Sequence, residues 1–189
     1  ELKKRAEKNN IQFLSTPVGT KTAKLLHEIK VNSFKIASGE INNLELITQI
    51  ANYRKPIIVS TGMSTLSEIL TTVERIQENE CPFAILHCIS CYPTKIQDAN
   101  LSTITYFQNI FNVPVGYSDH TLGNDACLTA VALGSNILEK HFTLDKNMEG
   151  PDQKISGDVA EFKELVKKTR NIEKSLGIPR AKPYPQEIK

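Results

Sequence analysis

The sequence lacks three features that would assign it to a common non-enzymatic class. Its 189 residues carry a net charge of only +2, and lysine and arginine are spread over helix-like stretches, so no basic patch for nucleic acid is visible. Tryptophan is absent and aromatic residues make up 6%, without a stacking platform for bases. No apolar run approaches the roughly 20 residues of a membrane helix, and the start has no signal-peptide pattern. We therefore expect a cytoplasmic protein that binds neither nucleic acid nor membrane.

The sequence does contain a repeated alternation of apolar runs and polar sets. Its apolar content of 40% is that of a globular protein. Six apolar, strand-like runs precede the polar sets: Phe13-Leu14, Phe34-Lys35-Ile36, Pro56 to Val59, Phe83 to Leu86, Val113-Pro114-Val115 and Ile137-Leu138. The polar sets that follow are Ser15-Thr16, Ser38-Gly39-Glu40, Ser60-Thr61-Gly62, His87-Cys88, Ser118-Asp119-His120 and Glu139-Lys140-His141. Helix-like stretches fill the gaps, which predicts parallel strands joined by right-handed crossovers.

This alternation predicts an α/β fold, namely a (β/α)8 TIM barrel, in which the strands' C-terminal ends carry the chemistry. A closed barrel needs eight units and about 250 residues, so we expect residues 1–178 to hold about the last six βα units. The polar stretch Glu1 to Asn10, without an initiator Met, resembles a helix end and suggests two units in front. Residues 179–189 contain three prolines, which predicts an extended linker toward a further C-terminal domain.

Local signals place several helix boundaries. Thr65 to Glu68 has the form of a capping box and opens an apolar-periodic run. Asn43 and Asn100 are each predicted to cap the helix that follows. The last helix is predicted from about Val159 to Leu176, before Gly177.

Cysteine occurs four times, and Cys88 and Cys91 form a C-x-x-C directly after His87. Such a pair could bind zinc or cycle as a disulfide. There is no second C-x-x-C to complete a structural zinc site, and Cys88 belongs to a buried strand. We therefore favour a small apolar role for Cys88.

His120 and His141 are the sharpest candidates for metal binding. Each ends a predicted strand, and the two strands are consecutive, so their imidazoles can converge at the barrel mouth. Two imidazoles would leave open positions for water and substrate on a divalent metal, as a catalytic site requires; the alternative is two hydrogen-bonded barrel residues without metal. His87 is a third candidate that may instead face the core, and His27 is expected on a helix surface.

Lys35 lies inside a predicted strand, where lysine is rarely buried without a partner. Hydroxyls at neighbouring strand ends favour an anion ligand, phosphate or carboxylate: Thr16, Ser38, Ser60, Ser90 and Ser118. The alternatives are a Schiff-base lysine, which needs a depressed pKa, and a structural ion pair with Glu40 or Glu139.

Taken in order, five groups of residues resemble the sialic acid synthase family, which includes N-acetylneuraminate, legionaminic and pseudaminic acid synthases. The resemblance runs from Phe13 to Gly177 and rests on Phe34 to Glu40 with Ser60 to Met63, Leu86 to Cys88 with Tyr92 to Thr94, Gly116 to Thr121, Glu139 to Thr143, and Gly150 to Asp152. It implies condensation of phosphoenolpyruvate with an N-acetylated amino-sugar aldehyde, which is N-acetylmannosamine or a 6-deoxy diacetamido analogue. The products would be phosphate and a nine-carbon 2-keto acid.

The resemblance also assigns roles. His120 and His141 match the family's metal ligands, usually for Mn²⁺, with Mg²⁺ or Co²⁺ as alternatives, and His120 and Glu40 stand at the reacting centre, Glu40 with a proton-handling role. The positions that match contacts to phosphoenolpyruvate are Thr16, Lys35, Ser38, Ser60, Ser118 and Ser90, the last being often Asn in relatives. Tyr92 and Asp152 match positions that hold the sugar.

The chain departs from the family in what it lacks. Relatives have two earlier strands, which supply a second phosphate-binding lysine and an acidic residue. They also have a C-terminal antifreeze-like domain that reaches the partner's site in a domain-swapped homodimer. The resemblance therefore implies that these 189 residues alone are inactive and that the parent is active. Cys91 is a smaller departure, beside the sugar contact at Tyr92.

Two other functions stay open. A metal-dependent barrel hydrolase or aldolase using His87, His120 and His141 would act without phosphoenolpyruvate. A non-catalytic sugar-phosphate binding protein would bind without turnover. The sugar acceptor itself depends on a few loop side chains and is not specified by these motifs.

Overall fold

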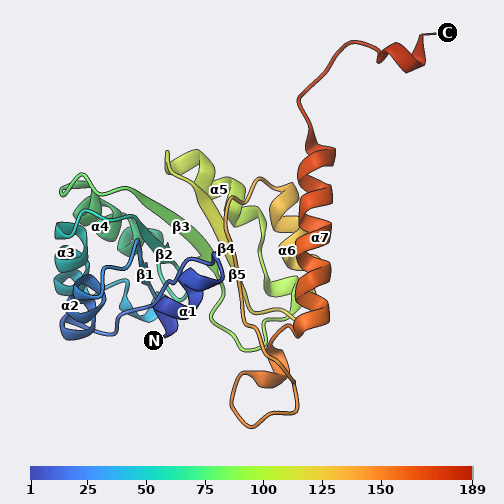
Figure 1. The fold of residues 1–189 in the computed structure, drawn as a ribbon. Helices are drawn as coiled ribbons and strands as arrows, with labels where there is room; N and C mark the ends of the chain where they lie inside the picture. Colours follow the sequence, from blue (N-terminus) through green and yellow to red (C-terminus); the bar gives the residue numbers. More distant parts are fainter. Residues whose placement is uncertain (189) are drawn as a thin grey trace.

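The fold is a single sheet of five parallel strands with helices on its convex side, in a computed structural model that describes residues 1–188 (Figure 1). The strand order follows the chain: β1 (Phe34–Ile36), β2 (Ile57–Ser60), β3 (Phe83–Cys88), β4 (Val115–Asp119) and β5 (Leu138–Lys140). Sequential parallel strands with helical crossovers build a half-barrel, as in part of a TIM barrel. The predicted α/β class and parallel pairing are confirmed.

Seven α-helices accompany the strands within residues 1–188. They are α1 (Leu2–Lys8), α2 (Thr20–Glu28), α3 (Leu44–Asn52), α4 (Leu66–Gln77), α5 (Ser102–Ile110), α6 (Asp125–Ala132) and α7 (Val159–Leu176). The capping box of Thr65 and Glu68 opens α4, and the Asn43 side chain accepts the Leu46 N–H at 3.1 Å to start α3. Both caps satisfy backbone donors that a helix start leaves free. The predicted bounds of α7 are confirmed as well.

Two local predictions are wrong. The run Phe13-Leu14 forms no strand, since residues 11–18 have no regular secondary structure. Asn100 does not cap α5, because Leu101 occupies that position and Asn100 has a left-handed backbone with φ of 46°. The side chain of Asn100 instead donates to the Asp98 carbonyl oxygen at 3.0 Å, so it caps no backbone N–H at the start of α5.

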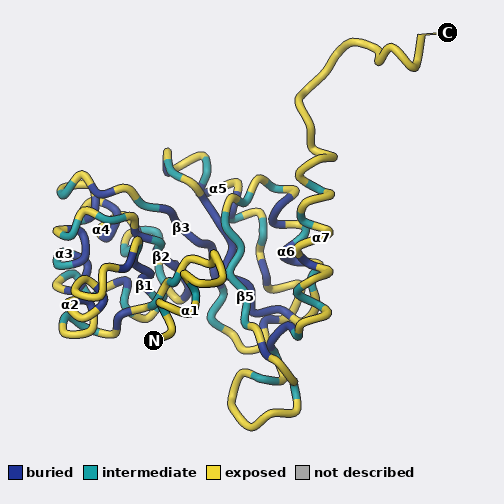
Figure 2. The backbone as a smooth tube through the Cα atoms, viewed as in Figure 1, coloured by how far each residue is buried: buried dark blue, intermediate teal, exposed yellow. Residues whose placement is uncertain are grey.

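The two faces of the sheet differ in chemistry because side chains alternate along each strand. Phe34, Ile36, Ile57, Val59, Ile85, Val115 and Tyr117 point to the helices and belong to the buried core. The intervening residues point to the concave face. Strands β1 to β4 are almost entirely buried (Figure 2), so a well-packed sheet carries the concave-face residues.

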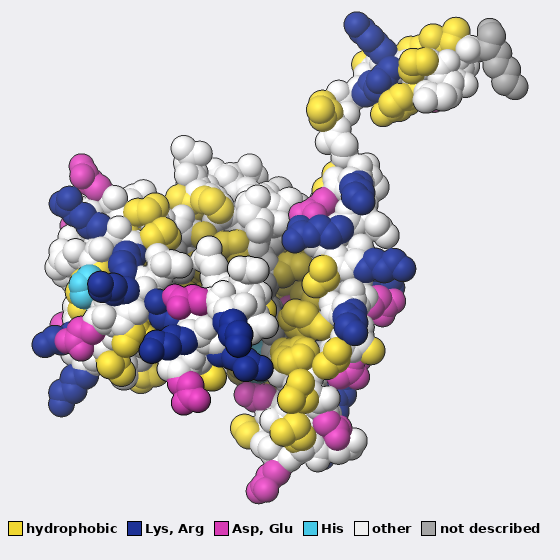
Figure 3. Space-filling model, in the orientation of Figure 1, with side chains coloured by type: hydrophobic (Ala, Val, Ile, Leu, Met, Phe, Trp, Pro, Cys, Tyr) yellow, Lys and Arg dark blue, Asp and Glu magenta, His cyan; other side chains and the backbone are white. Residues whose placement is uncertain are grey.

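The outer parts of the chain are the most exposed. Residues 177–188 extend away from α7 and are exposed throughout (Figure 2). Apolar side chains gather along the α7 side of the molecule (Figure 3), and Phe142, Leu144 and Val166 are each at least half exposed. None of the helices within residues 1–188 is long and apolar enough to cross a membrane.

Candidate functional site

The polar residues of the concave face lie together where the strands end. Strand alternation places Lys35 of β1, Ser60 of β2, Cys88 of β3, Ser118 of β4 and Glu139 of β5 on this face, opposite the core. His120 and His141 follow β4 and β5 by one residue. Parallel pairing brings all of these C-terminal strand ends to one edge of the sheet.

Lys35 is the centre of the first half of this site. Its side chain is buried, and Nζ donates to Ser60 Oγ at 2.7 Å and lies 3.3 Å from Glu139 Oε2. The other oxygen of Glu139 accepts a hydrogen bond from Ser118 Oγ at 2.7 Å. Of the two ion-pair alternatives for Lys35, the structure forms the one with Glu139.

Two histidines form the second half. The ring centroids of His120 and His141 lie 5.3 Å apart, and His141 Nδ1 lies 3.6 Å from Asp152 Oδ2. His120 Nδ1 lies 2.8 Å from the Ile89 carbonyl oxygen. A carbonyl only accepts, so this bond requires the proton on Nδ1 and leaves the lone pair of Nε2 for another partner.

This tautomer fits a metal ligand. Ligating histidines usually donate their second ring N–H to a carbonyl or carboxylate, as His120 does to Ile89 and as Asp152 could accept from His141. No group of three or more histidine, cysteine, aspartate or glutamate side chains within residues 1–188 is arranged to hold a metal. The described chain thus offers two imidazole ligands, and a metal held there would take its other ligands from elsewhere.

Cys88 borders the histidine half rather than forming a separate centre. Its sulfur lies 4.0 Å from His120 Nδ1 and 3.9 Å from Ser90 Oγ, and all four cysteines are free thiols. Burial opposes ionisation of Cys88, but contacts with His120 and Ser38 outweigh it and lower the pKa of the thiol. The same contact and the Ile89 carbonyl raise the pKa of His120 against its burial. Cys91 is exposed.

Gly62 allows Ser38 and Ser90, which follow β1 and β3, to lie close to its backbone. Ser38 Oγ accepts the Gly62 N–H at 2.9 Å. A Cβ on Gly62 would lie 2.3 Å from Ser90 Oγ and 2.9 Å from Ser38 Oγ, closer than real side chains approach. Glycine is therefore required for this packing.

The surroundings of three further predicted residues, Tyr92, Thr16 and Glu40, differ from one another. Tyr92 is half exposed, and its ring lies 4.2 Å from that of His120 and 5.9 Å from that of His141. Thr16 is exposed on the loop before α2. Glu40 accepts a hydrogen bond from Asn43 Nδ2 at 2.8 Å, at the start of α3.

His87 and His27 lie outside the site: the third metal candidate, His87, takes the alternative position in the core, and His27 is exposed as expected. His87 is buried on the helix side, where its Nε2 lies 2.8 Å from the Ala99 carbonyl oxygen and its ring stacks on Tyr117. His27 is exposed and stacks on Tyr53.

Two pockets adjoin β5, and their chemistry separates them. One, of about 200 Å³, is lined by Ser118, Asp119, Glu139, Lys140 and His141. The other, of about 270 Å³, lies between α6, β5 and α7 and has a mixed lining, with apolar residues such as Leu165 and Val166 beside polar ones such as Thr169. We assign the first to the site, because it joins the anion half to the histidine half.

Asp119 and Lys140 are the residues that the sequence pattern did not single out. They form a buried ion pair of 2.6 Å behind the histidines. Glu139 was considered only as a partner for Lys35. Asp119 and Lys140 each stand next to a predicted residue in the polar sets. Only the pairing of β4 with β5 shows that these two side chains meet.

Comparison with known proteins finds one family model, NeuB, which matches residues 1–180. The N,N'-diacetyllegionaminic acid synthase of Campylobacter jejuni is 44% identical over 94% of this chain and 54% of its own length. The human N-acetylneuraminate-9-phosphate synthase is 34% identical over all of this chain and 53% of its own. The chain thus spans about half the length of these curated relatives.

A solved structure is also similar to this chain. The N-acetylneuraminic acid synthetase of Leptospira borgpetersenii serovar Hardjo-bovis, in complex with citrate, superposes with a TM-score of 0.95 at 40% identity. The match covers 99% of this chain and 66% of that one. The backbone described above is therefore closely similar to the matched part of this synthetase.

Proposed function

The chain belongs to the NeuB family, and from this premise we propose that it forms part of a phosphoenolpyruvate-dependent synthase of a sialic-acid-type nonulosonic acid. The second substrate would be an N-acetylated amino-sugar aldehyde, and the products a nine-carbon 2-keto acid and phosphate. One observation carries the proposal: a buried lysine among hydroxyls lies on the same sheet face as a pair of histidines with free ring nitrogens.

We assign phosphoenolpyruvate to the Lys35 half of the site. The ammonium of Lys35 and the hydroxyls of Ser60 and Ser118 are donors that suit phosphate and carboxylate oxygens. Glu139 now neutralises Lys35, and an arriving anion would compete with it. Ser38, Ser90 and Thr16 complete the proposed set of contacts.

We assign the sugar to the histidine half. His120 and His141 would hold a divalent metal, Mn²⁺ by preference with Mg²⁺ or Co²⁺ as alternatives, and such a metal would polarise the sugar aldehyde as a Lewis acid. Tyr92 and Asp152 adjoin the two imidazoles and would hold the sugar hydroxyl and acetamido groups. Glu40 keeps its proposed proton-handling role.

The chain's own residues would act mainly by orientation. Lys35 and the serines fix one substrate against β1, β2 and β4, while Tyr92 and Asp152 fix the other beside β5. Holding two reactants in contact removes much of the entropic barrier to their combination. Donors aimed at the phosphate also stabilise the negative charge that develops as it leaves.

We further propose that residues 1–178 belong to a larger barrel domain and that residues 179–189 lead to a C-terminal antifreeze-like domain. The assembly would be a domain-swapped homodimer in the cytoplasm. The chain covers about half of its curated relatives, so these residues alone would be inactive. Residues supplied by the other parts would complete both substrate contacts.

Phosphate release by the full-length protein tests the proposal. The assay contains phosphoenolpyruvate and Mn²⁺, with N-acetylmannosamine or a diacetylated 6-deoxy sugar added in turn. We expect release that requires one sugar, stops with chelator and is lost in His120→Ala and His141→Ala. Lys24→Met, on the exposed face of α2, serves as the unaffected control.

The two alternatives give different results in the same assay. A metal-dependent hydrolase or aldolase would act on its substrate without phosphoenolpyruvate. A sugar-phosphate binding protein would bind a sugar in calorimetry and release no phosphate with any of them. Either result would contradict the synthase proposal.

A further inference from the structure

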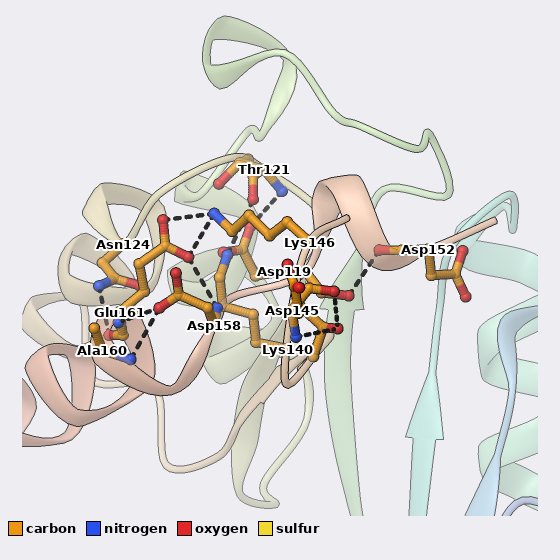
Figure 4. Close-up of polar contacts among 12 residues, drawn as sticks. Asp119, Thr121, Asn124, Lys140, Asp145, Lys146, Asp152, Asp158, Ala160 and Glu161 are labelled. Carbon is orange, nitrogen blue, oxygen red and sulfur yellow. Dashed lines mark hydrogen bonds and ion pairs between the residues drawn. The ribbon is translucent and has the colours of Figure 1, made fainter. Parts of the chain in front are cut away.

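The ion pair of Asp119 and Lys140 joins β4 to β5 at the residue before each candidate metal ligand. Asp119 and Lys140 are register partners in the sheet, and Lys140 Nζ lies 2.6 Å from Asp119 Oδ2 (Figure 4). The two side chains are 4% and 0% exposed. The residues that directly follow the two strands are His120 and His141.

The same pair also holds the backbone on both sides of His120. Asp119 Oδ1 accepts the Thr121 N–H at 2.8 Å, and Lys140 Nζ donates to the Thr121 carbonyl at 3.0 Å (Figure 4). The residues before and after His120 are thus bound to one ion pair. A shift of β5 relative to β4 would have to break at least one of these bonds.

The carboxylate of Asp119 has no freedom to follow such a shift. Tyr117 Oη donates to Oδ1 at 3.1 Å and Cys127 Sγ donates to Oδ2 at 3.2 Å, in addition to Thr121 and Lys140. These contacts come from β4, α6 and β5, so three elements fix the group. Charged hydrogen bonds in a dry environment are strong and strictly directional.

Strand alternation places the carboxylate of Asp119 on the helix side of the sheet. Asp119 contacts α6 and therefore lies on the helix side, whereas His120 and His141 reach the concave face. Asp119 and Lys140 also line the pocket beside His141, but their charged groups bind each other and the Thr121 backbone, so the ion pair acts on the two imidazoles through the backbone that carries them.

We propose that Asp119 and Lys140 are positioning residues that fix the separation of His120 and His141 and thereby set the affinity of the pair for a divalent metal. The inference rests on the metal site of the proposed function. An ion pair that served stability alone could be replaced by neutral side chains with little loss. A positioning pair could not be replaced in this way, because neutral side chains would lose the contacts that bind Lys140 to the Asp119 carboxylate and to the Thr121 carbonyl.

The test compares metal affinity with stability in the full-length, metal-free protein. The key variant is Asp119→Asn/Lys140→Met, which keeps the Oδ1 acceptor for Thr121 and Tyr117 and leaves no charge unpaired. Mn²⁺ affinity is measured by calorimetry, Co²⁺ coordination by its visible absorption, and stability by urea unfolding. Lys146→Met breaks an ion pair with Glu161 that is partly exposed and is the matched control.

We expect the wild type and Lys146→Met to bind Mn²⁺ alike. The double variant should bind it roughly 10- to 100-fold more weakly, the loss typical of groups that orient metal ligands, with an altered Co²⁺ spectrum. Its stability should lie closer to the wild type than that of Asp119→Asn. Lys140→Arg, which keeps the charge but changes the reach of the donor, should shift the Co²⁺ spectrum with little loss of stability.

Several results would overturn the inference. Mn²⁺ affinity in the double variant within threefold of the wild type would reduce the ion pair to a structural role. If the double variant does not fold, an unchanged Co²⁺ spectrum in Lys140→Arg would do the same. Failure of the wild type to bind Mn²⁺ or Co²⁺ would remove the metal assignment and this inference with it, a result distinct from the other two.

Discussion

The structure contains two lysine–carboxylate pairs one layer apart, and they differ in how completely they are enclosed. Lys140 and Asp119 are 4% and 0% exposed and 2.6 Å apart, and every oxygen of Asp119 has a protein partner. Lys35 and Glu139 are 7% and 41% exposed and 3.3 Å apart. The first pair lies behind the strands, and the second lies on their open face.

This difference separates an architectural pair from one that can receive a ligand. In the closed pair the ammonium and the carboxylate are both shielded from solvent, so an arriving anion has little access to Lys140. The Lys35 ammonium has a half-exposed carboxylate as its main neutralising partner, so another anion can take that place at modest cost. The exposure of the carboxylate that pairs with each lysine, and not the presence of a lysine in a strand, therefore distinguishes the candidate binding residue.

Breaking the closed pair should have the largest effect on stability. Asp119→Asn leaves the Lys140 ammonium buried without its counter-charge, which typically destabilises a protein by about 3–5 kcal/mol. Urea unfolding of variant and wild type measures the difference. A loss below about 1 kcal/mol would mean that water or another carboxylate reaches Lys140, and the pair would not be closed.

Breaking the open pair should change binding more than stability. Lys35→Met removes a charged donor to the anion, and each such hydrogen bond contributes about 1.5–3 kcal/mol, or roughly 10- to 150-fold in affinity. Titration with phosphoenolpyruvate measures this loss, and Lys24→Met is the control. The anion assignment would be wrong if Lys35→Met weakened sugar use more than phosphoenolpyruvate use.

His87 extends the comparison to a buried group that stays neutral. Burial lowers the pKa of His87, and its hydrogen bond to the Ala99 carbonyl only partly opposes this. Because the unfolded chain binds the proton more readily, this contribution to stability is complete above about pH 6.5 and is lost as pH falls below it.

We expect stability of the wild type to fall more steeply than that of His87→Gln between about pH 7 and pH 5. Glutamine retains a donor for Ala99 and does not titrate. Urea unfolding at several pH values gives the slopes, with His27→Gln as the control for loss of an exposed histidine. Parallel curves for His87→Gln and the wild type would show that His87 is accessible to protons in the folded state.

The smallest effect should come from Lys146→Met. Its pair with Glu161 is as short as the closed one, at 2.7 Å, but the side chains are 37% and 34% exposed. Solvent-exposed pairs contribute about 0–1 kcal/mol. A loss in urea unfolding comparable to that of Asp119→Asn would show that length, and not enclosure, governs these pairs.

The fold was predictable where a signal is local. The run at β3 and the capping box before α4 both specify their elements without help from distant residues. Phe13-Leu14 failed as a strand because a strand exists only with a partner, and two apolar residues before Pro17 provide no evidence of one. Asn100 failed as a cap because residue type alone does not fix its backbone angles.

The site was predictable in its residue types and not in its connections. Strand-end positions identified Lys35, His120 and His141 as neighbours, and the structure brings them to one edge. The ion pair of Lys35 with Glu139 joins the first strand of the sheet to the last; the sequence offered it as one alternative and did not decide between Glu139 and Glu40. The partners of Asp119 likewise depend on register, which a one-residue slip would change.

Gly62 limits what directed evolution could do with this site. The hydroxyls of Ser38 and Ser90 already fill the place where its side chain would stand, so even an added methyl group would displace both serines. A library built on this site should therefore leave Gly62 unchanged. Diversity is better placed at half-exposed Tyr92, where larger or smaller side chains can be accommodated.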